Sequence, residues 1–143
     1  MVAVDGSNTS YLAVQEAIKL SKALKAKLKI IYIVDETMIN NIDVHLDVDT
    51  LWNGLIDEGR DVLNKLSDEM KQSKITFETS LIELKPIEGR LAEKIVAEAK
   101  AWPADLLVIG THGRRGFNHL FLGTVAEHVV RIATMPVQLV RGQ

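Results

Sequence analysis

Short segments rich in β-branched and aliphatic residues alternate with segments of helical periodicity along the whole chain, and this alternation leaves few possible folds. The apolar segments predict strands over residues 2–4, 28–34, 75–82, 106–109 and 137–140. Apolar residues at helical spacing predict helices over 11–24, 50–71, 88–101 and 124–133. Strands that alternate with helices pair in parallel through right-handed crossovers. The sequence therefore predicts an α/β fold, a three-layer sandwich with helices on both faces of a five-stranded parallel sheet.

The strand patterns also indicate how deeply each strand lies. Residues 30–34 and 106–109 are continuously apolar, which is typical of strands that are covered on both faces. Residues 75–82 alternate between apolar and polar side chains, which predicts a half-buried strand near a sheet edge. The last strand opens at Pro136, and we expect it at an edge as well. Residues 37–49 have no clear period and are predicted to form a loop.

Length and composition restrict the class of protein. A chain of 143 residues is about one domain long, so we expect a single domain over 1–143. The absence of cysteine excludes disulfides, thiolate metal sites and a cysteine nucleophile. A net charge of −2 argues against a nucleic-acid partner. No apolar run reaches the ~18–20 residues that cross a bilayer, so we expect neither a signal peptide nor a membrane partner, and we predict a cytoplasmic protein.

Two turns follow predicted strands at their carboxyl ends, which is where parallel α/β folds bind ligands. The first turn is Asp5-Gly6-Ser7, in which Ser7 is a good N-cap for the helix that follows. The second is the glycine-rich segment 110–124, which follows the fourth predicted strand. Glycine lets a ligand approach the backbone without a Cβ in the way. These two turns are therefore the candidate binding loops.

The second turn has the features of a phosphate-binding loop. Gly123 and Thr124 open a predicted helix, whose first N–H groups lack internal partners and carry the positive end of the helix dipole. His112 and Arg114 add basic side chains, and no acidic residue lies between Asp105 and Glu127. This combination suits phosphate groups.

Two known phosphate-binding patterns are absent from these turns. Segment 110–124 contains no Gly-Lys-Ser/Thr, which a Walker P-loop requires, and the turn after the first predicted strand contains no GxGxxG dinucleotide motif. One alternative also stays open at this point. The segment could be a long turn whose glycines merely permit tight backbone geometry.

The spacing Gly110-x2-Gly113-x9-Gly123-Thr124 resembles the ATP-binding motif of the universal stress protein family. The similarity extends to residues 2–7, 31–34, 88–95, 104–110, 126–131 and 136–141, which is nearly the whole chain. Each of these segments alone is a weak signal, but together they are specific to the family. The resemblance implies the strand order 3-2-1-4-5 of the adenine nucleotide alpha hydrolase-like fold.

The resemblance also implies a ligand and the residues that bind it. The ligand would be ATP, or ADP or AMP, with Mg²⁺ accompanying the phosphates. Asp5 would contact the nucleoside, the backbone at Ile33 the adenine edge, and Gly110 and Gly113 the ribose and phosphates. Arg114 would supply a counter-charge to the phosphates. The full predicted cofactor-binding set is Ala3, Val4, Asp5, Ser7, Ile33, Ile109, Gly110, His112, Gly113, Arg114, Gly123, Thr124 and Val125.

The function implied by the resemblance is that of a nucleotide-dependent stress-response sensor or regulator, dimeric through residues 137–140. Two alternatives belong to other classes. One is a slow ATPase or an adenine-nucleotide hydrolase or transferase of the same fold, although its His-x-Gly-His or Ser-Gly-Gly-x-Asp-Ser signature does not appear at the first turn. The other is an interaction module that binds no nucleotide, against which the intact glycine spacing argues.

No catalytic constellation stands out, and we predict neither catalytic residues nor protein ligands for a metal. The one metal-like grouping is His45 with Asp43, Asp47 and Asp49, all within the predicted loop. Histidine and aspartate at such short spacing in a loop are common by chance, so this grouping is weak.

Overall fold

A five-stranded parallel sheet forms the centre of the computed structural model, which describes residues 1–41, 47–114 and 122–142. The strands run in the order β3-β2-β1-β4-β5, and each neighbouring pair is parallel. This confirms the predicted strand order and places β3 and β5 at the two edges. The strands are β1 (Val2–Val4), β2 (Leu28–Asp35), β3 (Phe77–Leu84), β4 (Leu107–Gly110) and β5 (Val137–Val140).

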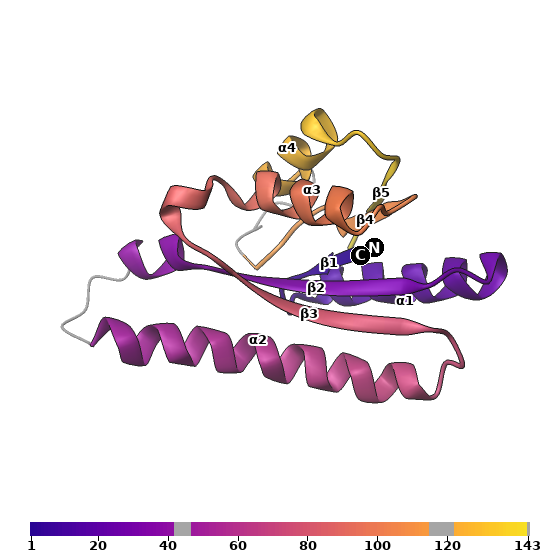
Figure 1. Cartoon of the computed structure of the whole chain (residues 1–143), viewed down its shortest axis with the longest axis horizontal. Coiled ribbons are helices and arrows are strands. Elements are labelled where there is room, and N and C mark those ends of the chain that lie inside the picture. Colours follow the sequence, from indigo (N-terminus) through magenta and orange to yellow (C-terminus); the bar gives the residue numbers. More distant parts are fainter. Residues whose placement is uncertain (42–46, 115–121, 143) are drawn as a thin grey trace.

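Within the described residues, four α-helices cover the sheet, two on each face, which confirms the predicted three layers (Figure 1). Helices α1 (Asn8–Leu24) and α2 (Val48–Lys71) pack on one face, and α3 (Leu91–Ala101) and α4 (Thr124–Ile132) on the other. None of the described helices is both long enough and apolar enough to cross a membrane.

Strand β2 shows why the apolar runs are continuous. Ile30, Tyr32 and Val34 lie in the core beneath α1 and α2, whereas Ile31 lies in the core beneath α3 and Ile33 packs against that core. Successive side chains of a strand point to opposite faces, so a strand covered on both sides needs an apolar residue at every position. The sequence pattern thus follows from the three layers.

Helix boundaries differ from the predicted ones by a few residues. Helix α1 begins at Asn8, three residues before the predicted start, and Ser7 caps it by accepting a hydrogen bond from the Ser10 N–H. Helix α3 begins at Leu91 rather than at 88. The reason is Gly89, whose φ of 103° separates α3 from a short 3-10 turn, η2 (Pro86–Glu88).

The segment predicted as a loop contains local structure where it is described. A 3-10 turn, η1 (Glu36–Asn41), follows β2, and α2 already begins at Val48. Asp47 caps α2, with its carboxylate accepting from the Asp49 N–H and the Thr50 hydroxyl. Asp43 and His45 lie outside the described residues. Among those that are described, no group of three His, Asp or Glu side chains is arranged to hold a metal ion.

The strand order reverses between β1 and β4, and this reversal positions the site. Strand β1 pairs with β2 on one side and with β4 on the other, with Ala3 opposite Ile109. The chain leaves β1 toward α1 on one face, and the helices that follow β3 and β4 lie on the other face. Connections that diverge in this way leave a crevice at the carboxyl ends of the strands.

Candidate functional site

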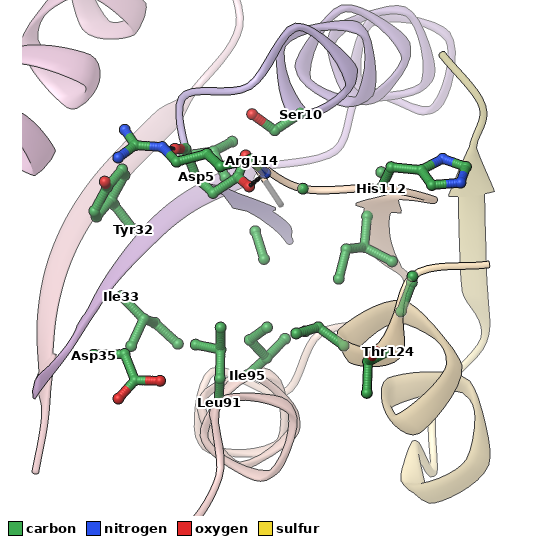
Figure 2. Close-up of a pocket in the computed structure, with 18 of the residues that line it drawn as sticks. Asp5, Ser10, Tyr32, Ile33, Asp35, Leu91, Ile95, His112, Arg114 and Thr124 are labelled. Atoms are coloured by element: carbon green, nitrogen blue, oxygen red, sulfur yellow. Dashed lines mark hydrogen bonds between the residues drawn. The ribbon is translucent and has the colours of Figure 1, made fainter. Parts of the chain in front are cut away.

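A cavity of about 400 Å³ lies at the carboxyl ends of β1, β2 and β4, between the sheet and helices α3 and α4 (Figure 2). Its volume falls within the range of small-molecule sites. Every predicted site residue except Ser7 lines this cavity. The tertiary structure therefore brings together segments that the sequence analysis selected separately.

Ser7 lies outside the residues that line the cavity, and its position has another explanation. Its hydroxyl accepts from the Ser10 N–H at 3.2 Å and so caps α1. Its own N–H donates to Asp5 Oδ1 at 3.0 Å. Ser7 therefore shapes the turn after β1 and is not part of the cavity wall.

The cavity has further lining residues that the sequence analysis did not assign to it. Some follow from strand periodicity, because Ile31 and Asp35 share the face of β2 that carries Ile33. Others come from the inward stripe of α3, which sequence periodicity alone treats as ordinary core. The unassigned lining residues are Ser10, Ile31, Tyr32, Asp35, Met38, Leu91, Ile95, Thr111 and Ala126.

The motif glycines also have a purely structural reason. A Cβ atom at Gly113 would lie 2.5 Å from Asp5 Oδ2, and one at Gly123 would lie 2.9 Å from the Thr111 carbonyl oxygen. Both glycines thus allow the chain to approach itself closely. The glycine spacing alone does not require a ligand, so the open cavity beside these residues is the independent observation.

The amino end of α4 presents backbone donors to the cavity. The first hydrogen bond of this helix runs from the Glu127 N–H to the Gly123 carbonyl at 2.9 Å. The N–H groups of Thr124, Val125 and Ala126 precede that bond, and all three residues line the cavity. The first N–H groups of a helix have no intrahelical acceptor and carry its positive dipole end. This end of the cavity can therefore bind an anion.

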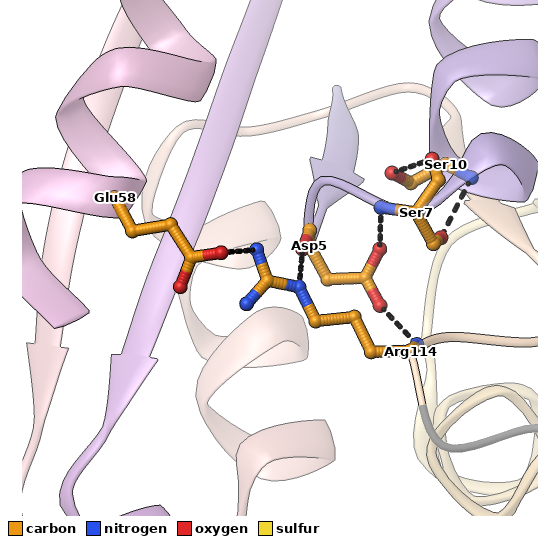
Figure 3. A network of polar contacts seen from close by, with 5 residues as sticks. All are labelled: Asp5, Ser7, Ser10, Glu58 and Arg114. Carbon is orange, nitrogen blue, oxygen red and sulfur yellow. Dashed lines mark hydrogen bonds and ion pairs between the residues drawn. The ribbon is translucent and has the colours of Figure 1, made fainter.

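Asp5 ties the glycine-rich turn to β1 (Figure 3). Its Oδ1 accepts from the Ser7 N–H, and its Oδ2 accepts from the Arg114 N–H at 2.9 Å. The Arg114 Nε–H also donates to the Asp5 carbonyl oxygen. The carboxylate predicted to contact a nucleoside is thus already holding the backbone on either side of the cavity mouth.

The Arg114 guanidinium is directed toward α2. Its Nη2 lies 2.6 Å from Glu58 Oε1, and its Cζ lies 5.9 Å from the centre of the Tyr32 ring. The hydrogen bond to Glu58 raises the pKa of Arg114, with burial acting in the opposite direction. Burial raises the pKa of Tyr32, while the positive charge of Arg114 lowers it. In Figure 2, Arg114 lies beside Tyr32, on the opposite side of the pocket from Thr124.

His112 follows the end of β4, between Gly110 and Gly113, and lines the cavity. Its Nδ1 lies 2.9 Å from the Thr111 hydroxyl oxygen. The side chain thus takes part in the structure of the turn, and a contact between His112 and a nucleotide stays a prediction.

Comparisons with known proteins give one consistent result. The model of the universal stress protein family matches residues 1–141. The universal stress protein MJ0531 of Methanocaldococcus jannaschii is 30% identical over 141 residues, which cover 99% of this chain and 80% of that protein.

Solved structures agree with this result. A universal stress protein family member from Burkholderia pseudomallei is similar with a TM-score of 0.78 at 28% identity, covering 99% of this chain and 95% of that one. A universal stress protein in complex with cAMP is similar with a TM-score of 0.64 at 26% identity, covering 98% and 94%. With the strand order, these likenesses show the adenine nucleotide alpha hydrolase-like fold.

Proposed function

Because the chain belongs to the universal stress protein family, we propose that it binds an adenine nucleotide in the cavity between β1 and β4 and acts as a nucleotide-dependent stress-response sensor or regulator. The observation that carries the proposal is the cavity itself. It joins an apolar wall to a helix amino end whose first N–H groups have no acceptor within the helix and can therefore donate to an anion.

The two ends of the cavity suit the two ends of a nucleotide. The phosphates would lie at the amino end of α4, against the N–H groups of Thr124 and Val125. The base would lie between Ile33 and the side chains of Leu91 and Ile95, which form the apolar wall. Adenine is flat and largely apolar, so such a wall favours it over solvent.

The ligand that we propose is ATP, with ADP and AMP as its shorter forms. The complex of a relative with cAMP supports an adenine nucleotide in a fold of this kind. Mg²⁺ would arrive with a triphosphate and would be held by phosphate oxygens and water, because Mg²⁺ needs few protein ligands.

A change of charge at the amino end of α4 tests the proposal. We expect isothermal titration calorimetry to detect ATP binding by the unmodified chain. Thr124→Glu places a carboxylate where the phosphates would lie and should lower ATP affinity at least about tenfold, because like charges repel at short range. The same carboxylate at a helix amino end favours the fold, so thermal stability should hold or rise.

Thr124→Gln is the matched control for this experiment. It has nearly the same size as the glutamate variant but no charge, and it should bind ATP much more tightly than Thr124→Glu does. Equal ATP affinity in the two variants would show that the phosphates do not bind at the amino end of α4. Absence of ATP binding to the unmodified chain at millimolar concentration would refute the proposal as a whole.

Catalysis is the alternative of a different class, and the same samples test it. Analysis of the bound nucleotide after incubation with ATP would show conversion to ADP or AMP. A turnover number of about 1 s⁻¹ would indicate that the protein is an enzyme and not a regulator. Slow hydrolysis or autophosphorylation would leave nucleotide binding as the main property.

We also propose that the protein is a homodimer that associates through β5 and works in the cytoplasm, where adenine nucleotides are abundant. Strand β5 is an edge strand that pairs with β4 on one side. Leu139 on this strand is 38% exposed. An edge strand with exposed apolar side chains offers backbone groups and surface to a second copy.

A further inference from the structure

The side chain of Arg114 is held by two other segments of the chain. Glu58 from α2 and the carbonyl of Asp5 after β1 both accept hydrogen bonds from its guanidinium (Figure 3). We propose that Glu58 and Arg114 form a positioning pair that fixes the start of the glycine-rich turn for nucleotide binding, and that Arg114 does not contact the phosphates. This inference rests on the proposed function and assigns a role to Glu58, which does not line the cavity.

Helix α2 brings Glu58 within reach of Arg114, because the helix packs against β2 and β3 at the neighbouring Gly59. A Cβ atom at Gly59 would lie 2.7 Å from Leu81 Cδ1 and 2.8 Å from Tyr32 Cδ1, so a larger residue at this position would require α2 or these side chains to move. Tyr32 also provides the ring over which the Arg114 guanidinium lies. The position of Glu58 is therefore set by close packing of the helix, although the carboxylate itself is 46% exposed.

The pair holds the part of the turn that borders the cavity. Arg114 donates to Asp5 from its backbone N–H and from its side chain, which ties the residue after Gly113 to the end of β1. Gly113 packs against the same carboxylate. Because the turn leaves β4 and is fixed to β1, the two strands that border the crevice are bridged at its mouth.

Charge and position argue against a phosphate contact. The Arg114 charge is already opposed by Glu58 at 2.6 Å, and in Figure 2 the side chain lies across the pocket from Thr124, where the helix donors are. A phosphate-binding arginine and a positioning arginine respond oppositely to loss of Glu58. The first would be released toward the ligand and would bind ATP more tightly, whereas the second would lose its anchor and weaken binding.

Glu58→Gln separates the two roles. We expect calorimetry to show a two- to fivefold weaker affinity for ATP, and the same factor for adenosine, which has no phosphates; the factor is about that of a partly exposed ion pair. The matched control is Asp57→Asn. It removes the same charge one position away, from a side chain that is 70% exposed and pairs with Arg60. Its affinities should stay within about 1.5-fold of the unmodified chain.

The remaining outcomes overturn the inference in distinguishable ways. Tighter ATP binding by Glu58→Gln, or a loss confined to ATP, would make Arg114 a phosphate ligand. Exchange of the Arg114 amide hydrogen, measured by NMR without nucleotide, should be faster in Glu58→Gln than in Asp57→Asn, because the N–H donates to Asp5. Unchanged exchange would overturn the positioning pair whether or not ATP binds. Faster exchange in a chain that binds neither ATP nor adenosine would refute the proposed function while keeping the bridge between α2 and the turn.

Discussion

Replacing each of the two glycines of α2 by alanine should change the free energy of unfolding in opposite directions. Both replacements improve helix propensity, which stabilises by roughly 0.5–1 kcal/mol. At Gly54 the added Cβ meets no described atom within 4 Å outside its own helix, so Gly54→Ala should show that full gain. At Gly59 the added Cβ would lie 2.7–2.9 Å from Leu81 Cδ1 and from two ring carbons of Tyr32.

The magnitude at Gly59 follows from these distances. Non-bonded carbon atoms prefer about 3.5–4.0 Å, so α2 or the Tyr32 ring must move. Overpacking a core of this kind costs typically about 1–3 kcal/mol. After subtraction of the propensity gain, Gly59→Ala should destabilise by about 1 kcal/mol, which puts the two variants about 2 kcal/mol apart. That difference corresponds to roughly 4–8 °C in Tm for a domain of this size.

Urea unfolding followed by circular dichroism measures both variants under the same conditions. A higher midpoint for Gly54→Ala and a lower one for Gly59→Ala, with unchanged slopes, is the expected result. Equal stabilisation by both replacements would refute the reasoning, because it would mean that α2 does not press on Tyr32. The structural explanation for the position of Glu58 would then fail with it.

Four further outcomes are expected. Ser7→Ala should cost about 1 kcal/mol of stability through loss of the α1 cap, with ATP affinity unchanged in calorimetry; a large loss of affinity would place Ser7 in the site. Lys27, 2.6 Å from Glu78, lowers the pKa of that carboxyl, so this pair stabilises the fold at neutral pH and its contribution disappears as the pH falls through the lowered pKa. Glu78→Gln should therefore flatten the acid side of a plot of Tm against pH. ATP at about 100 times its Kd should stabilise the chain by about 2.7 kcal/mol in a thermal melt. Leu139→Lys should convert the proposed dimer to monomer in analytical ultracentrifugation, and an unchanged sedimentation coefficient would move the interface away from β5.

The sequence alone was sufficient for the layers and for the existence of every described strand, although β3 (Phe77–Leu84) lies two residues after the predicted 75–82. Runs such as 30–34 are apolar at every position because both sheet faces are covered, and that requirement is visible in neighbouring residues. Helix ends were less accurate. The start of α3 depends on the positive φ of Gly89, which the apolar period does not indicate. The start of α1 depends on the Ser7 cap, which the sequence did offer, although the apolar period was visible only from residue 11 onward.

The candidate cavity was predictable where its residues carry local signals. Gly110, Gly113 and Gly123 mark close backbone approach, and Thr124 marks a helix start, so all of these could be selected from the sequence. Leu91 and Ile95 could not, because a side chain that faces a cavity and one that faces the core have the same helical period.

The direction of the Arg114 side chain shows what only the tertiary structure decided. In the sequence, Arg114 is a basic residue in a glycine-rich turn, and a phosphate contact is the natural hypothesis. In the structure its guanidinium is paired with Glu58, a residue that is distant along the chain and carries no motif. Local backbone preferences are set by adjacent residues, so they can be predicted from them. Which charged side chains meet depends instead on how closely α2 packs on β2, and that distance is fixed only when the whole core has formed.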